Sequence, residues 1–143
     1  MTARLAHRNL PRLLLQARES VMAHVRPNLR EQALSDQQWR VLRVLGEHGM
    51  VETGRVAREA FILGPSLTGV LARMERDGLI QRSRDPDDQR RSVVEATTEG
   101  LALVKVLSRS IEAHYAGMEK SLGKQKLTAL YALLDKLIEL EKP

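Results

Sequence analysis

Residues 63–96 constrain the fold of this chain more than any other segment. After a Gly-Pro turn, apolar residues recur at the i, i+3, i+4, i+7 spacing of one buried helical face: Leu67, Val70, Leu71 and Met74. Gly78 then provides a left-handed stop. Residues 79–84 and 92–96 have the composition of strands, and an Asp-Pro-Asp-Asp turn separates them. The segment therefore predicts a short helix followed by a β-hairpin with a charged tip.

Two helices are predicted nearer the N-terminus. Residues 10–29 form an apolar stripe of helical period, and Pro27 is placed to kink or end that helix. Ser35 is the expected N-cap of the next helix, and Gln38 completes a capping box. We expect this second helix to end at the glycines within residues 46–49.

A third short helix completes an arrangement typical of DNA-binding proteins. Residues 50–51 fit a short strand, and Thr53 is the expected N-cap of a helix reaching Ala60. Two short helices joined by a tight turn and followed by a hairpin define a helix-turn-helix with a wing, whose second helix enters the DNA major groove. The outward residues of that helix, which suit contact with base edges or phosphate, are Ser66, Thr68, Gly69 and Arg73.

The predicted hairpin carries arginines at its tip, Arg90 and Arg91, and two more at its base. An arginine on a narrow loop suits the negative potential of the minor groove. We expect Asp88 to brace the Arg90 guanidinium through a bidentate pair. Residues 73–91 nevertheless carry six arginines against five acidic residues. Placement, rather than bulk charge, must therefore provide the DNA contacts.

The composition excludes several classes of protein. The 143 residues include no cysteine, which removes disulfide frameworks, thiolate zinc sites and cysteine nucleophiles. No apolar run approaches the roughly 18–20 residues that cross a bilayer. The N-terminus lacks the uninterrupted apolar stretch and cleavage site of a secretory signal. We therefore expect a cytoplasmic protein with no membrane partner.

The positive charge is unevenly distributed along the chain. Lys and Arg number 23 against 18 Asp and Glu, and 16 of the 17 arginines precede Ser92, whereas every lysine follows Thr98. The planar guanidinium suits phosphates and guanine edges, although a compositional bias or solvated helix faces would give the same counts. Four aromatic residues are too few for a platform that stacks single-stranded bases.

The C-terminal part predicts two further helices, one from Thr98 to about Gly123 and one over residues 127–140. The last helix is apolar on more than one side, so it needs a covering surface. A partner subunit is the economical cover, and burial on its own domain is the alternative. We therefore expect a dimerisation region in residues 1–34 and 98–143, and a winged helix-turn-helix in residues 35–97, within one continuous unit. The expected fold class is mainly α with a small β-hairpin wing.

Two motifs resemble a known family. DPDDQRRSVVEATTEG (85–100) resembles the wing signature of the MarR family of winged-helix regulators, and PSLTGVLARMERDGLIQR (65–82) resembles its recognition helix and first wing strand. The resemblance runs from about Pro11 to Leu140. Through LLQARES (14–20), LSDQQWRVLRVL (34–45) and ILGPSLTGVLARMERDGL (62–79), the chain is most similar to homoprotocatechuate-operon repressors and related nicotinate-pathway regulators.

This resemblance implies a homodimeric repressor that binds a palindromic operator and is released by a small aromatic acid from a catabolic pathway. It places Ser66, Thr68 and Arg73 at recognition-helix contacts and Asp88 and Arg90 at the wing pair.

Two positions depart from the family pattern. Phe61 occupies a turn position that often holds glycine, so we expect a reshaped turn in which Gly64 helps. Gly69 replaces a polar or basic contact residue found in many members.

The resemblance also implies an effector site where the N-terminal helix and the Trp39 helix meet the DNA-binding lobe. The matching residues are Arg18, His24, Trp39, Arg40 and Arg43. An arginine or histidine there would hold a carboxylate, and Trp39 would cover an aromatic ring. The alternative is that Trp39 is ordinary core and Arg43 a surface charge.

Signals for catalysis are absent from the sequence. The four histidines have no metal-ligand spacing, and there is no phosphate-binding loop or nucleophile elbow. We therefore expect no enzyme activity, metal or cofactor. A different class of function stays open, namely a winged-helix protein-interaction module that does not bind DNA. Such a module has no need for small polar residues and arginines on both the helix and the wing.

Overall fold

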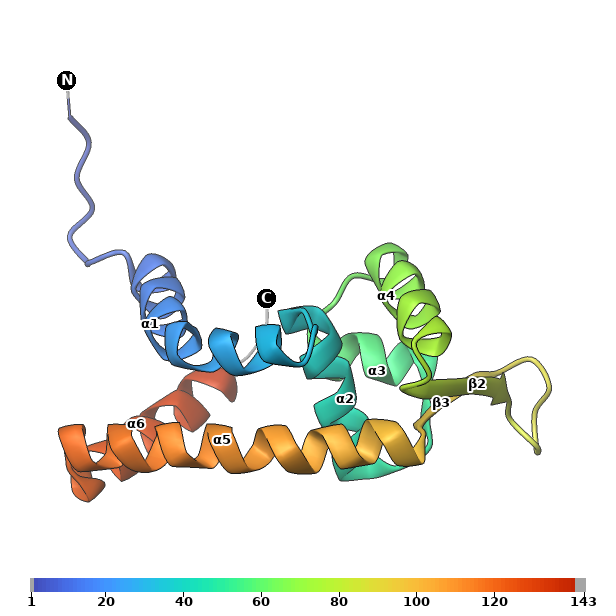
Figure 1. The fold of residues 1–143 in the computed structure, drawn as a ribbon. Helices are drawn as coiled ribbons and strands as arrows, with labels where there is room; N and C mark the ends of the chain where they lie inside the picture. The colour runs from blue at the N-terminus through green and yellow to red at the C-terminus, as the bar shows by residue number, and fades with distance from the viewer. Residues whose placement is uncertain (1, 141–143) are drawn as a thin grey trace. The chain divides into compact units, whose positions relative to one another are not determined.

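The computed structural model describes residues 2–140, which form six helices and a small antiparallel sheet of three strands. The chain divides into two compact units, the first running through Ser108 and the second beginning at Arg109. The mainly α fold with a hairpin wing, predicted from the sequence, is confirmed (Figure 1). Residue 1 and residues 141–143, the ends of the predicted dimerisation region, lie outside the described residues.

The first unit opens with α1 (Leu10–Glu31) and α2 (Asp36–His48). Pro27 lies inside α1, which ends about one turn later at Glu31. The predicted capping box of α2 is present: the Ser35 hydroxyl accepts the Gln38 N–H at 3.1 Å, and the Gln38 side chain accepts the Ser35 N–H at 3.0 Å. The helix ends at His48, and its C-cap residue Gly49 has a φ of 74°, which favours glycine.

Helices α3 (Thr53–Ala60) and α4 (Gly64–Arg76) form the helix-turn-helix. The predicted N-cap of α3 is wrong by one residue. Glu52 occupies the cap, without a side-chain cap bond, and Thr53 is the first helical residue. The Thr53 hydroxyl instead donates to the Ser92 carbonyl at 3.0 Å, because the start of α3 lies against the sheet. The four predicted core residues of α4 are all buried.

The turn between α3 and α4 is not reshaped as the sequence predicted. Phe61 itself takes the left-handed conformation, with φ 53° and ψ 49°, and Gly64 is an ordinary first residue of α4. The N–H of Phe61 donates to the Arg58 carbonyl at 3.4 Å, and the N–H of Ile62 donates to the Ala57 carbonyl at 3.0 Å. This is the Schellman pattern of a helix end, and the buried Ile62 anchors it.

The sheet has the order β1 (Val51–Glu52), β3 (Ser92–Ala96), β2 (Ile80–Arg84), with both pairs antiparallel. Ile80, Val93 and Val94 are buried and hold the sheet on the helices. The loop between β2 and β3 projects beyond α4 as the predicted wing (Figure 1).

Helix α5 (Thr98–Leu122) begins in close contact with the start of the hairpin. The Thr97 hydroxyl donates to the Gly78 carbonyl at 2.7 Å and accepts the Gly100 N–H at 3.1 Å. A side chain at Gly100 would overlap the Leu79 carbonyl oxygen. Glycine at position 100 therefore permits this close approach of two backbones.

The second unit contains the rest of α5 and α6 (Lys124–Ile138), joined at Gly123 with φ 92°. Ile111 and Leu127 are its buried apolar residues. Many large apolar side chains of this unit are exposed: Leu122, Leu130, Tyr131, Leu133, Ile138 and Leu140. Among the described residues, no helix is long and apolar enough to cross a membrane.

Candidate nucleic-acid interface

Helix α4 has two faces of opposite character. Its apolar face is buried against the domain, whereas Ser66, Thr68 and Arg73 are exposed and Gly69 is half-buried. The Thr68 hydroxyl donates a long hydrogen bond of 3.4 Å to the Gly64 carbonyl. Because this bond is long, the hydroxyl can exchange it for a hydrogen bond to an external group. A polar, small-residue face on a helix held by its opposite side fits a DNA groove.

Arg73 lies back along α4 toward Gly69. An added Cβ at Gly69 would stand 3.4 Å from Nη1 of Arg73. The same geometry recurs on α3, where a Cβ at Gly54 would stand 3.5 Å from Nη1 of Arg58. Both helices of the motif therefore present an exposed arginine that lies over a glycine one turn earlier.

The arginines of this region divide into two groups. Arg82 is held by Glu75, whose carboxylate accepts its backbone N–H at 3.1 Å and its Nη2 at 2.9 Å. These hydrogen bonds lower the pKa of Glu75 below its ordinary value, with the side-chain bond from Arg82 as the largest cause. By contrast, across residues 2–140 no carboxylate forms an ion pair with Arg58, Arg73 or Arg84. These three guanidinium groups are available to an external anion.

The wing tip is ordered by its own hydrogen bonds. The Asp87 N–H donates to the Asp85 carboxylate at 2.9 Å, and the Asp85 N–H donates to the Arg91 carbonyl at 2.9 Å. Such Asx turns are typical of Asp at a tight loop. The Arg90 side chain extends from this hydrogen-bonded loop and is 92% exposed.

Asp88 contacts both tip arginines, but not in the predicted bidentate geometry. One oxygen, Oδ1, accepts the backbone N–H and the Nε–H of Arg90, both at 3.1 Å. The other, Oδ2, lies 3.6 Å from Nε of Arg91, whose Nη1 lies 3.8 Å from Glu52. Because Asp88 and Arg90 are only two residues apart, the carboxylate meets Nε of Arg90 and not the two terminal nitrogens that a bidentate pair would use. The side-chain bond from Arg90 is the largest cause of a lowered pKa at Asp88.

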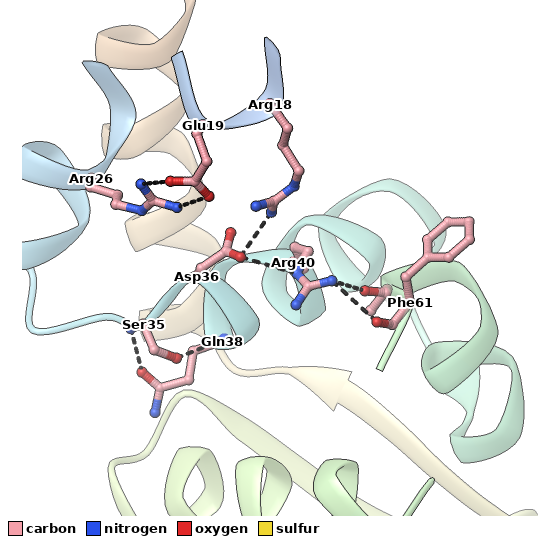
Figure 2. Close-up of polar contacts among 9 residues, drawn as sticks. Arg18, Glu19, Arg26, Ser35, Asp36, Gln38, Arg40 and Phe61 are labelled. Atoms are coloured by element: carbon pink, nitrogen blue, oxygen red, sulfur yellow. Dashed lines mark hydrogen bonds and ion pairs between the residues drawn. The ribbon is translucent and has the colours of Figure 1, made fainter. Parts of the chain in front are cut away.

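The structure brings two of the predicted effector residues together. Arg18 of α1 donates to Oδ2 of Asp36 at 2.8 Å, and Nε of Arg40 lies 3.6 Å from the same oxygen (Figure 2). The other carboxylate oxygen of Asp36 is buried, with no hydrogen-bond partner among residues 2–140. Asp36 was not among the residues predicted from the sequence, although an acid in the first turn of a capped helix is a recognisable signal.

The remaining predicted effector residues occupy different environments. Trp39 is buried in the core, His24 is exposed, and Arg43 is exposed with Nε 3.4 Å from Glu47 of the same helix. No group of His, Cys, Asp and Glu among residues 2–140 is arranged to hold a metal ion.

A helix-turn-helix followed by a small sheet with a projecting hairpin defines the winged-helix class. The MarR family model matches residues 34–92. The HTH-type transcriptional regulator FarR of Neisseria gonorrhoeae is 40% identical over 90% of this chain and 88% of its own length. The chain belongs to the MarR family, and these relatives are transcriptional regulators.

Two further similarities lie within the branch indicated by the sequence. The homoprotocatechuate degradative operon repressor of Escherichia coli is 41% identical over 94% of this chain and 90% of its own length. The crystal structure of NadR in complex with 4-hydroxyphenylacetate matches with a TM-score of 0.87 and 38% identity, covering 99% of this chain and 100% of that one. The predicted family and branch are therefore confirmed.

Proposed function

We propose that this chain is a dimeric transcriptional repressor that binds a palindromic operator and is released by a small aromatic acid of a catabolic pathway. The observation that carries this proposal is the exposed polar face of α4. The arginine of this face, Arg73, lies in the last turn of α4 and has no carboxylate partner within residues 2–140. Because Arg73 is free of an internal carboxylate partner and lies on the same helix as two exposed hydroxyls, these side chains can form hydrogen bonds with base edges in a major groove.

The seven proposed DNA contacts lie on two elements with different roles. Ser66, Thr68, Gly69 and Arg73 face base edges from α4. The wing residues Asp88, Arg90 and Arg91 act at the neighbouring minor groove, where Arg90 enters and Asp88 limits its freedom.

Exposed apolar side chains support the proposed dimer. In the first unit, α1 exposes Leu10, Leu14 and Leu15, and in the second unit α6 exposes Leu133 and Ile138 at 64% and 75%. Apolar area of this kind is unfavourable in water and is covered when a partner subunit docks. We therefore propose that the N-terminal and the C-terminal helix each contribute to the dimer.

The effector is proposed to bind near Asp36. NadR was crystallised with 4-hydroxyphenylacetate, and another relative is a homoprotocatechuate operon repressor. Arg18, Arg40 and Arg43 supply cations for a carboxylate, together with His24, and the unpartnered Oδ1 of Asp36 would accept a ligand hydroxyl. Trp39 lies in the adjoining core, where its ring would flank an aromatic ligand.

The test uses a DNA duplex that the protein selects from random sequence. In a mobility-shift titration, 4-hydroxyphenylacetate should release the selected duplex, whereas phenylacetate, which lacks the hydroxyl, should release it less well. Arg18→Met should weaken release of the duplex by the acid more than it weakens binding of the duplex without ligand. Selection of no sequence would instead favour a winged-helix interaction module. Selection without release by either acid would overturn only the effector part of the proposal.

A further inference from the structure

We propose that Arg40 is a positioning residue for DNA binding, which fixes the recognition helix by holding the turn that precedes it. This inference rests on the proposed DNA-binding function and gives Arg40 a second role, in addition to its proposed contact with the effector carboxylate. Arg40 lies on α2, yet its guanidinium reaches the C-terminal end of α3 (Figure 2).

The Arg40 guanidinium contacts two consecutive carbonyl oxygens at the end of α3. Its Nη1 donates to the Ala60 carbonyl at 2.9 Å and to the Phe61 carbonyl at 3.2 Å. The last carbonyls of a helix have no partner within the helix, and the Schellman bonds described above use only those of Ala57 and Arg58. A cation at this end also complements the partial negative charge of the helix C-terminus. Arg40 therefore gives partners to two carbonyls of this turn that the Schellman bonds do not use.

The turn that Arg40 holds contains a backbone conformation that phenylalanine rarely adopts. Phe61 has φ 53°, and its side chain is 86% exposed, so packing of the ring contributes little to keeping it there. A non-glycine residue in the left-handed region is unfavourable unless its surroundings enforce it. The Arg40 contacts on both sides of the Phe61 α-carbon supply part of that enforcement.

The position of α4 depends directly on this turn. Helix α4 begins at Gly64, three residues after Phe61, with Ile62 buried between them. A change in the Phe61 dihedral angles would therefore alter the direction in which the chain enters α4. Base contacts by Ser66 and Arg73 require α4 to keep one orientation, whereas attraction to phosphates depends much less on the orientation of α4.

Asp36 forms an ion pair with the other side of the Arg40 guanidinium, whose buried Nε has no hydrogen-bond partner among residues 2–140. Its Oδ2 lies 3.6 Å from Nε of Arg40 and also accepts the hydrogen bond from Arg18 of α1. The same carboxylate thus links α1 to the side chain that holds the turn.

A double-mutant cycle tests this role. The variants are Arg40→Met, Phe61→Gly and the combination of both, with Arg55→Met as a charge-matched control from α3. Arg55 pairs with Glu59 at 3.0 Å and does not touch the turn carbonyls. Each protein is titrated with the duplex selected by the wild type and with a scrambled duplex of the same composition, and thermal unfolding is recorded for every variant.

We expect Arg40→Met to weaken binding of the selected duplex about tenfold and of the scrambled duplex less than about twofold. The reason is that a smaller fraction of the molecules then has α4 in the orientation that the base contacts require. In the Phe61→Gly background, Arg40→Met should weaken binding of the selected duplex less than about threefold. Glycine adopts the left-handed conformation readily, so it does not need the Arg40 hydrogen bonds. Arg55→Met should leave the ratio of the two affinities unchanged.

Three results would overturn the inference. Equal losses on both duplexes would make Arg40 a phosphate contact, and an undiminished loss in the Phe61→Gly background would separate Arg40 from the turn. A ratio unchanged by Arg40→Met would remove the positioning role. All three require the wild type to select a sequence, so failure of that selection is a failure of the proposed function instead.

Discussion

Asp88 and Arg90 form a hydrogen-bonded pair at the tip of the wing, in which one carboxylate oxygen accepts both the backbone N–H and the Nε–H of Arg90 at 3.1 Å. The arginine nevertheless remains almost fully exposed. The pair therefore restricts the side chain without neutralising its terminal nitrogens by direct contact. An anchored and exposed guanidinium is suited to enter a narrow groove with little further loss of freedom.

We predict that Asp88→Ala weakens operator binding at moderate salt, although it removes a negative charge. Loss of the brace costs on the order of 1 kcal/mol in side-chain freedom on binding. Loss of the acid favours approach to phosphates by a similar amount, and salt screens that term. Titrations at low and moderate salt should show the loss of affinity only at moderate salt. Tighter binding by the variant at both concentrations would mean that Asp88 only shapes the turn and does not brace Arg90.

The brace should persist in mildly acidic solution. The Arg90 hydrogen bond lowers the pKa of Asp88, so the carboxylate stays charged until the pH falls through that lowered pKa. The effect of Asp88→Ala should therefore be the same at about pH 6 as at about pH 8. An effect that disappears on going to pH 6 would contradict the assigned interaction.

Arg73→Ala should weaken binding of the selected duplex by about 1–3 kcal/mol per half-site, the range of a lost base contact. Binding of a scrambled duplex should change much less. The matched control is Arg76→Ala on the same helix, because Arg76 is exposed and pairs with Asp77. Equal losses on both duplexes would show that Arg73 touches phosphate only.

Leu130→Glu with Leu133→Glu should convert the proposed dimer into a monomer. Both side chains are exposed in the single chain, so the substitutions leave its core intact. Thr128→Glu, also exposed on α6, adds charge as a control. Sedimentation velocity checks the prediction, and a double variant that remains a folded dimer would place the interface elsewhere.

Gly100→Ala should destabilise the protein by about 1–3 kcal/mol, because the new methyl group overlaps the Leu79 carbonyl oxygen. Gly117→Ala on the same helix meets nothing within 4 Å and should stabilise it by up to about 1 kcal/mol. Thermal unfolding of the two variants compares the effects directly. Similar shifts in both would contradict the close backbone approach at Gly100.

Most of the fold was predictable because its signals are local. Capping residues, apolar periodicity and turn residues sit next to the elements that they define, as the Ser35–Gln38 box and the Gly78 stop illustrate. The errors arose where a distant contact decided the outcome. Thr53 bonds to Ser92 across 39 residues instead of capping its helix, and Phe61 keeps a left-handed conformation with help from Arg40, which lies on another helix.

The candidate site was predictable in its residue types more than in its pairings. The exposed positions of α4 follow from helical periodicity alone, because the buried face determines the outward one. The sequence did not indicate that Arg40 turns toward α3, or that Asp36 joins it to Arg18, since both contacts depend on how separate helices pack. The repeated spacing of Gly54 to Arg58 and Gly69 to Arg73 was visible in the sequence, but only the structure shows that Arg58 lies over Gly54 as Arg73 lies over Gly69.

The ratio of affinities for a selected and a scrambled duplex tests the central claim most directly. The wild-type protein is titrated with both duplexes at near-physiological salt, because salt weakens the attraction to phosphates that both duplexes share. The account predicts that the selected duplex binds at least about a thousandfold more tightly, the lower limit for specific DNA-binding proteins. A ratio near one would contradict sequence-specific DNA binding by this chain.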